Sequence, residues 1–320
     1  MALNDILGEL KDDFVFEESE NPDFVLFGPY GPDLPPPGNY TRIGYFCENI
    51  IPDLGSCDWA FGVMPGDRVN SPKYRRIQWH GIDPQILVKP ANYRPEEILA
   101  GKKFFCNFLY SHRVPYREEF FKQLSKYKKV DAPGLSMNNI PGIDDQYPGT
   151  VWERKRKFLA EYKFTIAFEN YVYPGYQTEK LYDAMRADSL PIYCGDPQIG
   201  QVFNTNSFVF ANGYGRTADT GALRWLENQC QSGLKDIVPS FYRGPGRRLK
   251  RKLKVWGRQL KMHYQFDRKG VKQLVEQIAE LDRNDEKYLA VLREPWFHHN
   301  IPPPASHRQH WISIFNSRND

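Results

Sequence analysis

The sequence has 320 residues, of which 41% are hydrophobic and 26% charged, and its formal net charge is +4. This balance indicates a folded protein with room for two domains and excludes an intrinsically disordered chain. A charge of +4 is too small to predict a nucleic-acid-binding protein, and no stretch approaches the ~20 apolar residues of a membrane-spanning helix.

Short apolar runs alternate with amphipathic ones along most of the chain. Strands are expected at residues 23–29, 42–48, 57–63, 102–110, 163–170, 189–195 and 207–212. Helices are expected at residues 114–127, 150–162, 178–188 and 220–233. Alternation of this kind favours an α/β fold with largely parallel sheets.

Proline-containing stretches mark the expected boundaries between regions. Residues 88–97 read VKPANYRPEE, which contains two prolines and interrupts the strand–helix pattern, so this is the predicted linker. The run REPWFHHNIPPPASH near the end of the chain is typical of a loop. We therefore expect one Rossmann-like domain over residues 1–95, a second over 96–295 and a C-terminal tail over 296–320.

The segment FENYVYPGYQTEK, residues 168–180, lies where a predicted strand ends and a predicted helix begins. Ligands of doubly wound sheets bind at the carboxyl ends of the strands, and a helix N-terminus favours an anion. Thr178 is the candidate N-cap, and Lys180 could place its charge over a phosphate. Glu179 could accept hydrogen bonds from sugar hydroxyls, and Tyr176 could stack on a base. The alternative is an ordinary capped helix with solvated charges.

This segment and its surroundings resemble glycosyltransferase family 10, the α-1,3/4-fucosyltransferases. The family signature runs roughly F-x-[FL]-x-F-E-N, a spacer, Y-x-T-E-K, a helix and P-[IV]-x-x-G. Here it reads FTIAFENYVYPGYQTEKLYDAMRADSLPIYCGDP. Further upstream, KVDAPGLSMNN, FFCNFLYSHRVPYREEFFKQL and RIGYFCENIIPD are also similar to family segments. The resemblance covers roughly residues 40–300 and is strongest over 163–210.

The resemblance implies a GT-B fold, in which two Rossmann-like domains face each other across a cleft. The first domain would bind the acceptor and the second the donor, GDP-fucose. The implied reaction is an inverting transfer of L-fucose to a hydroxyl of an oligosaccharide, α-1,3 or α-1,4 to N-acetylglucosamine or glucose. Two alternatives stay open: the same scaffold with another GDP-sugar, and a non-catalytic module that binds GDP or a glycan. The chain starts at LNDILGEL without the family's usual opening strand, so its first domain is either reduced or trimmed.

Carried over residue by residue, the resemblance places donor binding on five side chains. These are Arg117, Asn170, Tyr176, Glu179 and Lys180. Arg117 and Lys180 would hold the diphosphate, and Glu179 would bind the ribose hydroxyls. Because the leaving diphosphate is already acidic, two cations can neutralise it without a metal ion. No DxD triplet with an apolar approach occurs, so neither a metal nor another cofactor is predicted.

Glu48 falls at the family's general-base position, at the end of the predicted strand RIGYFCE. Direct displacement at the anomeric carbon needs one base to take the proton of the acceptor hydroxyl. Asp67 and Asp58 are the nearest alternatives for that role. A further alternative is that Glu48 only positions the substrate.

Residues 242–266 contain nine Lys and Arg residues and no Asp or Glu, with apolar residues at helical spacing. A basic amphipathic helix of this kind can bind an anionic membrane surface. A helix with a solvated basic face and, less favoured, RNA binding are the alternatives; no nucleic-acid partner is predicted for the protein. Five scattered cysteines without a CxxC pair, and an N-terminus unlike a signal peptide, indicate a cytoplasmic protein, peripheral to the membrane if this helix binds it.

Two weaker motifs are present. GYGRTA, residues 213–218, fits a dinucleotide fingerprint, but no acidic residue closes a following strand, so no nicotinamide site is expected. The histidines at 298–299 and 307–310 could bind a metal, but in a proline-rich tail they are expected to be solvated.

Overall fold

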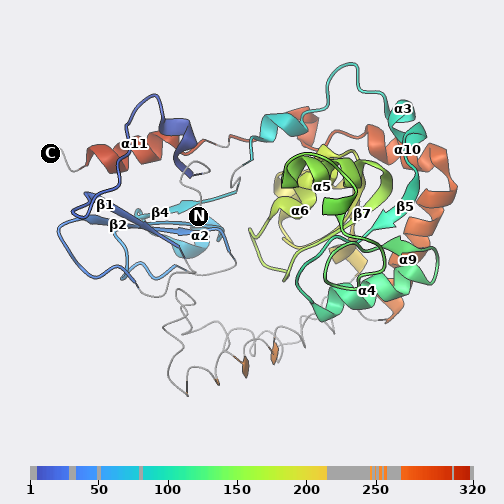
Figure 1. Ribbon diagram of the computed structural model, residues 1–320, viewed down its shortest axis with the longest axis horizontal. Coiled ribbons are helices and arrows are strands. Elements are labelled where there is room, and N and C mark those ends of the chain that lie inside the picture. Colours follow the sequence, from blue (N-terminus) through green and yellow to red (C-terminus); the bar gives the residue numbers. More distant parts are fainter. Residues whose placement is uncertain are drawn as a thin grey trace. The chain divides into compact units, whose positions relative to one another are not determined.

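The computed structural model describes residues 6–28, 34–48, 52–78, 82–214, 268–304 and 306–317, with isolated positions between 246 and 257. The described residues form two compact units (Figure 1). Those up to Gln85 and from Pro303 onward belong to unit 1. Those over 86–214 and 268–302 belong to unit 2. The boundary thus falls ten residues before the one expected at 95/96, and residues 303–317 join unit 1.

Unit 1 contains a parallel sheet in the order β1-β2-β3-β4. Its strands are β1 (Phe24–Phe27), β2 (Thr41–Phe46), β3 (Trp59–Gly62) and β4 (Tyr74–Arg76). Its α-helices are α2 (Gly66–Val69) and α11 (Arg308–Asn316). Because all neighbouring strands run parallel, the carboxyl ends of β2 and β3 meet at one edge of the sheet.

Helix α11 packs on the sheet of unit 1, although its sequence was expected to be a solvated tail. Trp311 is 1% exposed and stacks on Phe61 of β3, with ring centroids 4.2 Å apart. Ile314, one turn further, is buried in the same cluster. His307 contacts the Phe61 ring edge-on, so it too lies against the sheet. Spacing of Trp311 and Ile314 by three residues gives the helix the apolar side that the core requires.

Replacing Trp311 by alanine should lower the free energy of unfolding by about 3–5 kcal/mol, because the change removes a buried stacked ring and leaves a cavity. Guanidinium unfolding measures the loss. Gln309→Ala, an exposed position of the same helix, is the control and should change stability by less than about 0.5 kcal/mol. Equal effects of the two changes would contradict the packing of α11 on this sheet.

Unit 2 contains a five-stranded parallel sheet in the order β6-β5-β7-β8-β9. Its strands are β5 (Phe104–Asn107), β6 (Val130–Asp131), β7 (Tyr162–Phe168), β8 (Leu190–Cys194) and β9 (Val209–Phe210). Its α-helices are α3 (Pro95–Ala100), α4 (Pro115–Ser125), α5 (Val151–Ala160), α6 (Glu179–Arg186), α9 (Arg268–Arg283) and α10 (Asp285–Arg293). Single 3-10 turns of unit 2 lie at Ile143–Asp145, Ile199–Gln201, Thr205–Ser207, Ala211–Tyr214 and His298–Asn300, while Gly8–Leu10 lies in unit 1 and Pro84–Leu87 spans the boundary between the units.

The central strand β7 pairs with β5 on one side and with β8 on the other. Six of its seven residues are buried, as expected of a parallel strand covered on both faces. Helices α5 and α6 pack together against β7, while α4 packs against α9 (Figure 1). A capping box of Thr150 and Glu153 begins α5, and Pro115 begins α4 at its first turn.

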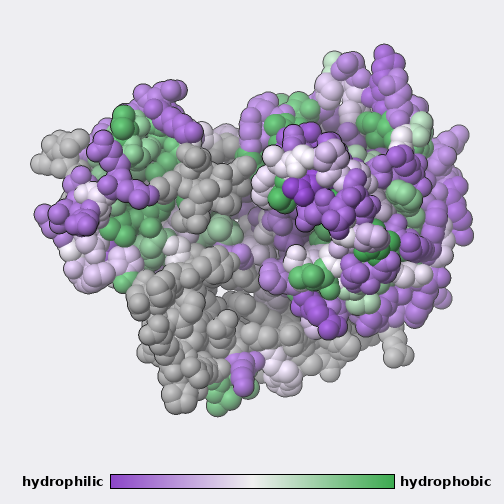
Figure 2. Space-filling view, in the orientation of Figure 1, coloured by the Kyte–Doolittle hydropathy of each residue, from purple (hydrophilic) through white to green (hydrophobic). Residues whose placement is uncertain are grey.

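The surface of unit 2, as far as the structure describes it, is mostly hydrophilic in the view of Figure 2, with small, separate apolar patches. Within the described part of the chain, no helix combines the length and the hydropathy needed to cross a membrane.

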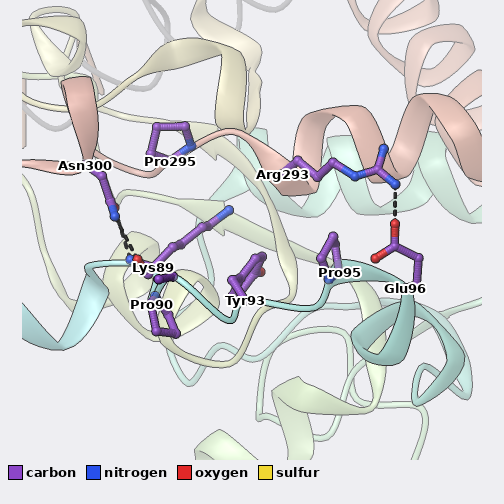
Figure 3. Close-up of a pocket in the computed structure, with 9 residues that line it drawn as sticks. Lys89, Pro90, Tyr93, Pro95, Glu96, Arg293, Pro295 and Asn300 are labelled. Atoms are coloured by element: carbon purple, nitrogen blue, oxygen red, sulfur yellow. Dashed lines mark hydrogen bonds and ion pairs between the residues drawn. The ribbon is translucent and has the colours of Figure 1, made fainter.

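The predicted linker is an integral part of unit 2, fixed by Lys89 (Figure 3). The ammonium group of Lys89 donates to the carbonyl oxygens of Leu292 and Glu294, which satisfies acceptors at the C-terminus of α10. The same group lies 3.8 Å from the centroid of the Trp296 ring. Asn300 exchanges two hydrogen bonds with the Lys89 backbone, at 3.0 and 2.7 Å.

Lys89 should contribute an increase of the free energy of unfolding with pH between about pH 7 and 10. Burial lowers the pKa of Lys89 to about 7, whereas an unfolded lysine titrates near ~10.4. Between these values the unfolded chain binds more protons, so stability increases as the pH rises. Lys89→Met should lose this part of the increase, as chemical unfolding at pH 7 and pH 9.5 will show. Lys102, whose pKa burial lowers to about 8, contributes equally in both proteins. An identical pH dependence of the two proteins would mean that Lys89 keeps its charge when folded.

Candidate functional site

The candidate site lies at the carboxyl edge of the unit 2 sheet, where β7 ends at Phe168. Residues 169–178 connect β7 to α6, and α4 follows the neighbouring strand β5. This edge therefore brings together Arg117 from α4, Asn170 from the connection and Lys180 from the first turn of α6. The sequence predicted these three residues as donor ligands, and the fold gathers them around one short segment.

Arg117 is 1% exposed, and its guanidinium spans the end of β7. One terminal nitrogen donates to the Phe168 carbonyl at 3.3 Å and to Asn170 Oδ1 at 2.9 Å. The other donates to the His112 carbonyl at 2.9 Å. The group also lies over the Tyr110 ring, 3.9 Å from its centroid. Among the residues described, Arg117 Nε has no hydrogen-bond partner, so this buried donor is unsatisfied, and a ligand could reach it only if neighbouring groups moved.

Lys180 lies among carboxylates at the start of α6. Its ammonium is 3.5 Å from Glu169 Oε2 and 3.3 Å from Glu179 Oε1, and it donates to Thr178 Oγ1 at 2.9 Å. Burial lowers the pKa of Lys180, but the charges of Glu169 and Glu179 outweigh that effect and the pKa is raised. Lys180 is therefore protonated at neutral pH and is available as a cation.

Glu179 is the other polar residue of the first turn, and its side chain is 40% exposed. Burial raises the pKa of this carboxyl, but the charges of Lys180 and Lys155 lower it by more, so the pKa of Glu179 lies below its ordinary value. At neutral pH Glu179 is an ionised acceptor, which is the state that binding of hydroxyl groups requires.

Thr178 occupies the N-cap position of α6, but its side chain does not cap that helix. Its hydroxyl instead donates to Glu169 Oε2 at 2.7 Å, and its backbone N–H donates to Glu169 Oε1 at 2.8 Å. Thr178 is thus the N-cap residue, as predicted, but its side chain donates to Glu169, nine residues earlier, and makes no capping hydrogen bond to α6.

Tyr176 is 1% exposed, so both faces of its ring are covered. Stacking of a base on this ring would require neighbouring groups to move. Gly175 precedes it with φ +79°, a left-handed conformation that favours glycine and turns the chain toward α6. Asn170 is exposed and accessible. A donor-binding role for Tyr176 stays a prediction, without an open stacking face to support it.

Two supporting features were not predicted from the sequence. The Tyr110 hydroxyl donates to the Ile166 carbonyl at 2.7 Å and accepts from the Phe168 N–H at 2.7 Å, which fixes the end of β7 beneath Arg117. A side chain at Gly134 would clash with the Tyr110 backbone, which accounts for glycine in KVDAPGLSMNN. Buried aromatic hydroxyls and close glycine contacts have no periodic signal in a single sequence.

In unit 1, Glu48 lies two residues after β2, at the carboxyl edge of that sheet, and is half-buried. Asp58 lies just before β3 and accepts from the Arg42 N–H at 2.8 Å, so it belongs to the opposite edge. Asp67 is exposed in α2, which follows β3, and therefore lies at the same edge as Glu48. The topology leaves Glu48 and Asp67 as candidates for the base and makes Asp58 unsuitable.

Several predictions concern residues outside the described part. The segment 242–266 lies there almost entirely, and its membrane contact stays a prediction; of its apolar residues, Leu249, Leu253 and Trp256 are described and exposed. The helix expected at 220–233 and most of GYGRTA lie outside it too. No group of three or more His, Cys, Asp or Glu residues in the described ranges could hold a metal ion. The prediction of metal-free transfer is not tested by that finding.

Solved structures share the fold of this protein. A crystal structure of an alpha1,3-fucosyltransferase with GDP matches 98% of this chain and 84% of that chain, with a TM-score of 0.59 and 19% identity. Another, with GDP-fucose, matches 93% and 78%, with a TM-score of 0.55 and 20% identity. The protein is therefore of the GT-B class, as predicted.

Residues 100–228 match the family model for the C-terminal part of glycosyltransferase family 10 (fucosyltransferase). The resemblance predicted from the sequence is thus confirmed over these residues. A putative fucosyltransferase of Acanthamoeba polyphaga mimivirus is 36% identical over 118 residues, 36% of this chain and 20% of that protein. An alpha-(1,3)-fucosyltransferase of Helicobacter pylori is 35% identical over 109 residues, 34% of this chain and 21% of that protein. Alpha-(1,3)-fucosyltransferase B of Drosophila melanogaster is 34% identical over 127 residues, which are 38% of this chain and 28% of that protein. The chain therefore matches only about a fifth to somewhat over a quarter of each relative's length.

Proposed function

We propose that the protein is an inverting fucosyltransferase that moves L-fucose from GDP-fucose to a hydroxyl of an oligosaccharide. The product would be an α-1,3 or α-1,4 linkage to N-acetylglucosamine or glucose. One observation carries the proposal: two cations flank the same three residues at the end of β7. Arg117 binds Phe168 and Asn170, and Lys180 pairs with Glu169 between them. The similarity to alpha-(1,3)-fucosyltransferases supports the choice of sugar.

In this proposal the two cations bind the diphosphate of the donor. Arg117 is held by three protein acceptors, and its buried Nε–H would reach the phosphates only after neighbouring groups move. Lys180 would keep its contacts to Thr178 and Glu169 and exchange its contact to Glu179 for the phosphates. As the glycosidic bond breaks, negative charge grows on the leaving diphosphate. Preorganised cations in a buried site stabilise that charge more strongly than water does. No metal ion is part of this mechanism.

The remaining roles are assigned to two carboxylates. Glu179 is ionised and partly exposed, so it can accept hydrogen bonds from the two ribose hydroxyls. Glu48 is the proposed general base for the acceptor hydroxyl, since it lies at the carboxyl edge of the unit 1 sheet, where α/β sheets bind their ligands. Attack on the anomeric carbon from the side opposite the diphosphate inverts its configuration.

GDP should raise the melting temperature of the protein, whereas UDP should not. A ligand at ~100 times its dissociation constant adds about 2.7 kcal/mol to the free energy of unfolding, which thermal scanning detects. The two nucleotides carry the same diphosphate, so any difference between them reports on the base. Equal shifts from GDP and UDP would contradict a site selective for a guanosine sugar, and no shift from either would contradict the diphosphate site itself.

A further inference from the structure

Glu169 is a fully buried carboxylate at the centre of the candidate site, outside the set of predicted donor ligands. It follows β7 directly and is 0% exposed. Both of its oxygens bind a single residue, Thr178, through the backbone N–H at 2.8 Å and the hydroxyl at 2.7 Å. A buried carboxylate without partners costs several kcal/mol, so both bonds are needed to keep this group in place.

A continuous chain of polar contacts leads from Glu169 to Lys180. The Thr178 hydroxyl donates to Glu169 Oε2 and accepts from Lys180 Nζ at 2.9 Å, so it uses both of its capacities. Lys180 Nζ is also 3.5 Å from Glu169 Oε2. Together these contacts limit the directions in which the lysine side chain can leave the first turn of α6.

The backbone of Glu169 is anchored as firmly as its side chain. Its N–H donates to the Cys194 carbonyl of β8 at 2.7 Å, and its carbonyl accepts from the Tyr116 hydroxyl of α4. A Cβ at Gly195 would lie 2.5 Å from Glu169 Cγ, so the neighbouring glycine leaves the space that this side chain fills. Glu169 thus links the end of β8, the helix that carries Arg117 and the helix that carries Lys180.

We propose that Glu169 is a positioning residue for the donor diphosphate, acting through Thr178 on Lys180. The inference rests on the proposed function, in which Lys180 binds that diphosphate. Without the carboxylate, the Thr178 hydroxyl loses its acceptor and Lys180 loses an ion-pair partner. The lysine then samples many rotamers, and part of its binding energy is spent on ordering it.

A double-mutant cycle on GDP affinity separates positioning from mere structural support. Wild type, Glu169→Gln, Lys180→Met and the double variant are titrated with GDP by calorimetry. Glu169→Gln should weaken binding about tenfold in the wild-type background, the size of one charge-assisted hydrogen bond. In the Lys180→Met background the same change should cost less than about twofold, since coupled residues are not additive. An equal loss in both backgrounds would overturn the proposal.

Thr178 provides a matched pair that avoids changing the buried charge. Thr178→Val removes the hydroxyl and keeps the shape, so it should weaken GDP binding by about the same factor as Glu169→Gln. Thr178→Ser keeps the hydroxyl and should bind GDP like wild type. If Glu169→Gln fails to fold, the cycle is made with Thr178→Val instead. Equal affinities of the valine and serine variants would contradict the proposal. Unchanged GDP affinity in Lys180→Met alone would contradict the proposed function, and this inference with it.

Discussion

Replacing Glu48 by glutamine should lower kcat by about 10²- to 10⁴-fold, the usual contribution of general base catalysis. Glutamine keeps the shape of the side chain and removes its basicity, so the acceptor hydroxyl must lose its proton without help. GDP binding and the melting temperature should stay nearly unchanged, because the donor ligands lie on unit 2 and Glu48 on unit 1. Steady-state kinetics with GDP-fucose and an acceptor measure the effect.

The two aspartates of unit 1 are the controls for this prediction. Asp58→Asn should leave kcat close to wild type, because Asp58 pairs with Arg42 at the other edge of the sheet. Asp67→Asn is the sharper comparison, since Asp67 follows β3 at the same edge as Glu48. An inactive Asp67→Asn beside an active Glu48→Gln would make Asp67 the base. If none of the three changes matters, the family mechanism does not apply to this chain.

Lys180→Ala should weaken GDP binding about tenfold to a hundredfold, because a charge-assisted hydrogen bond contributes about 1.5–3 kcal/mol. Turnover should fall at least as much, since the charge on the leaving diphosphate is greatest in the transition state. Calorimetry gives the dissociation constant and initial rates give kcat. Lys122→Ala removes the same charge from an exposed position of α4 and is the control.

Arg117 calls for a different substitution, because its guanidinium also binds three protein acceptors. Arg117→Ala should weaken GDP binding and turnover but also destabilise unit 2, since it leaves those buried groups unpaired. Arg117→Lys keeps the charge and removes the planar fork, including Nε. Weaker GDP binding in the lysine variant would support a directed contact from Arg117. Unchanged GDP affinity in both Lys180→Ala and the Arg117 variants would mean that the diphosphate is bound elsewhere.

The sequence predicted the elements whose pattern is long and strong. The seven expected strands all correspond to strands of the structure, and α4, α5 and α6 lie within the helices expected around them. Two strands were missed, β4 with three residues and β6 with two, because a run that short shows no periodicity. Their positions are set by pairing with β3 and β5.

Helices near the C-terminus were missed for another reason. In α9, the buried residues Val271, Leu274, Ile278 and Leu281 recur every three or four positions, so the signal was present in the sequence. In α11 the apolar residues that pack on the sheet are Trp311, Ile312, Ile314 and Phe315, within a single short run, and the prolines before it favoured a loop. Its burial depends on the sheet of unit 1, which is distant in sequence.

The candidate site was predictable in its location but not in its internal contacts. A polar, aromatic junction between a strand and a helix indicated the carboxyl edge of a parallel sheet, and Arg117, Asn170 and Lys180 meet there. Two details differ from the expectation: Tyr176 is buried and has no open face, and the side chain of the N-cap residue Thr178 donates to Glu169 and makes no capping hydrogen bond. Which polar residue lies inside and which faces solvent depends on packing that a local motif does not encode.

Transfer itself is the most direct test of the account. The protein is incubated with GDP-fucose and an array of oligosaccharides that end in N-acetylglucosamine or glucose, with and without EDTA, and the products are analysed by mass spectrometry. We expect one fucose added to an acceptor for each GDP released, in an α-1,3 or α-1,4 linkage, and equal activity in both conditions. Binding of GDP without transfer to any acceptor would contradict the account and indicate a non-catalytic module; transfer from a different GDP-sugar would contradict the choice of donor.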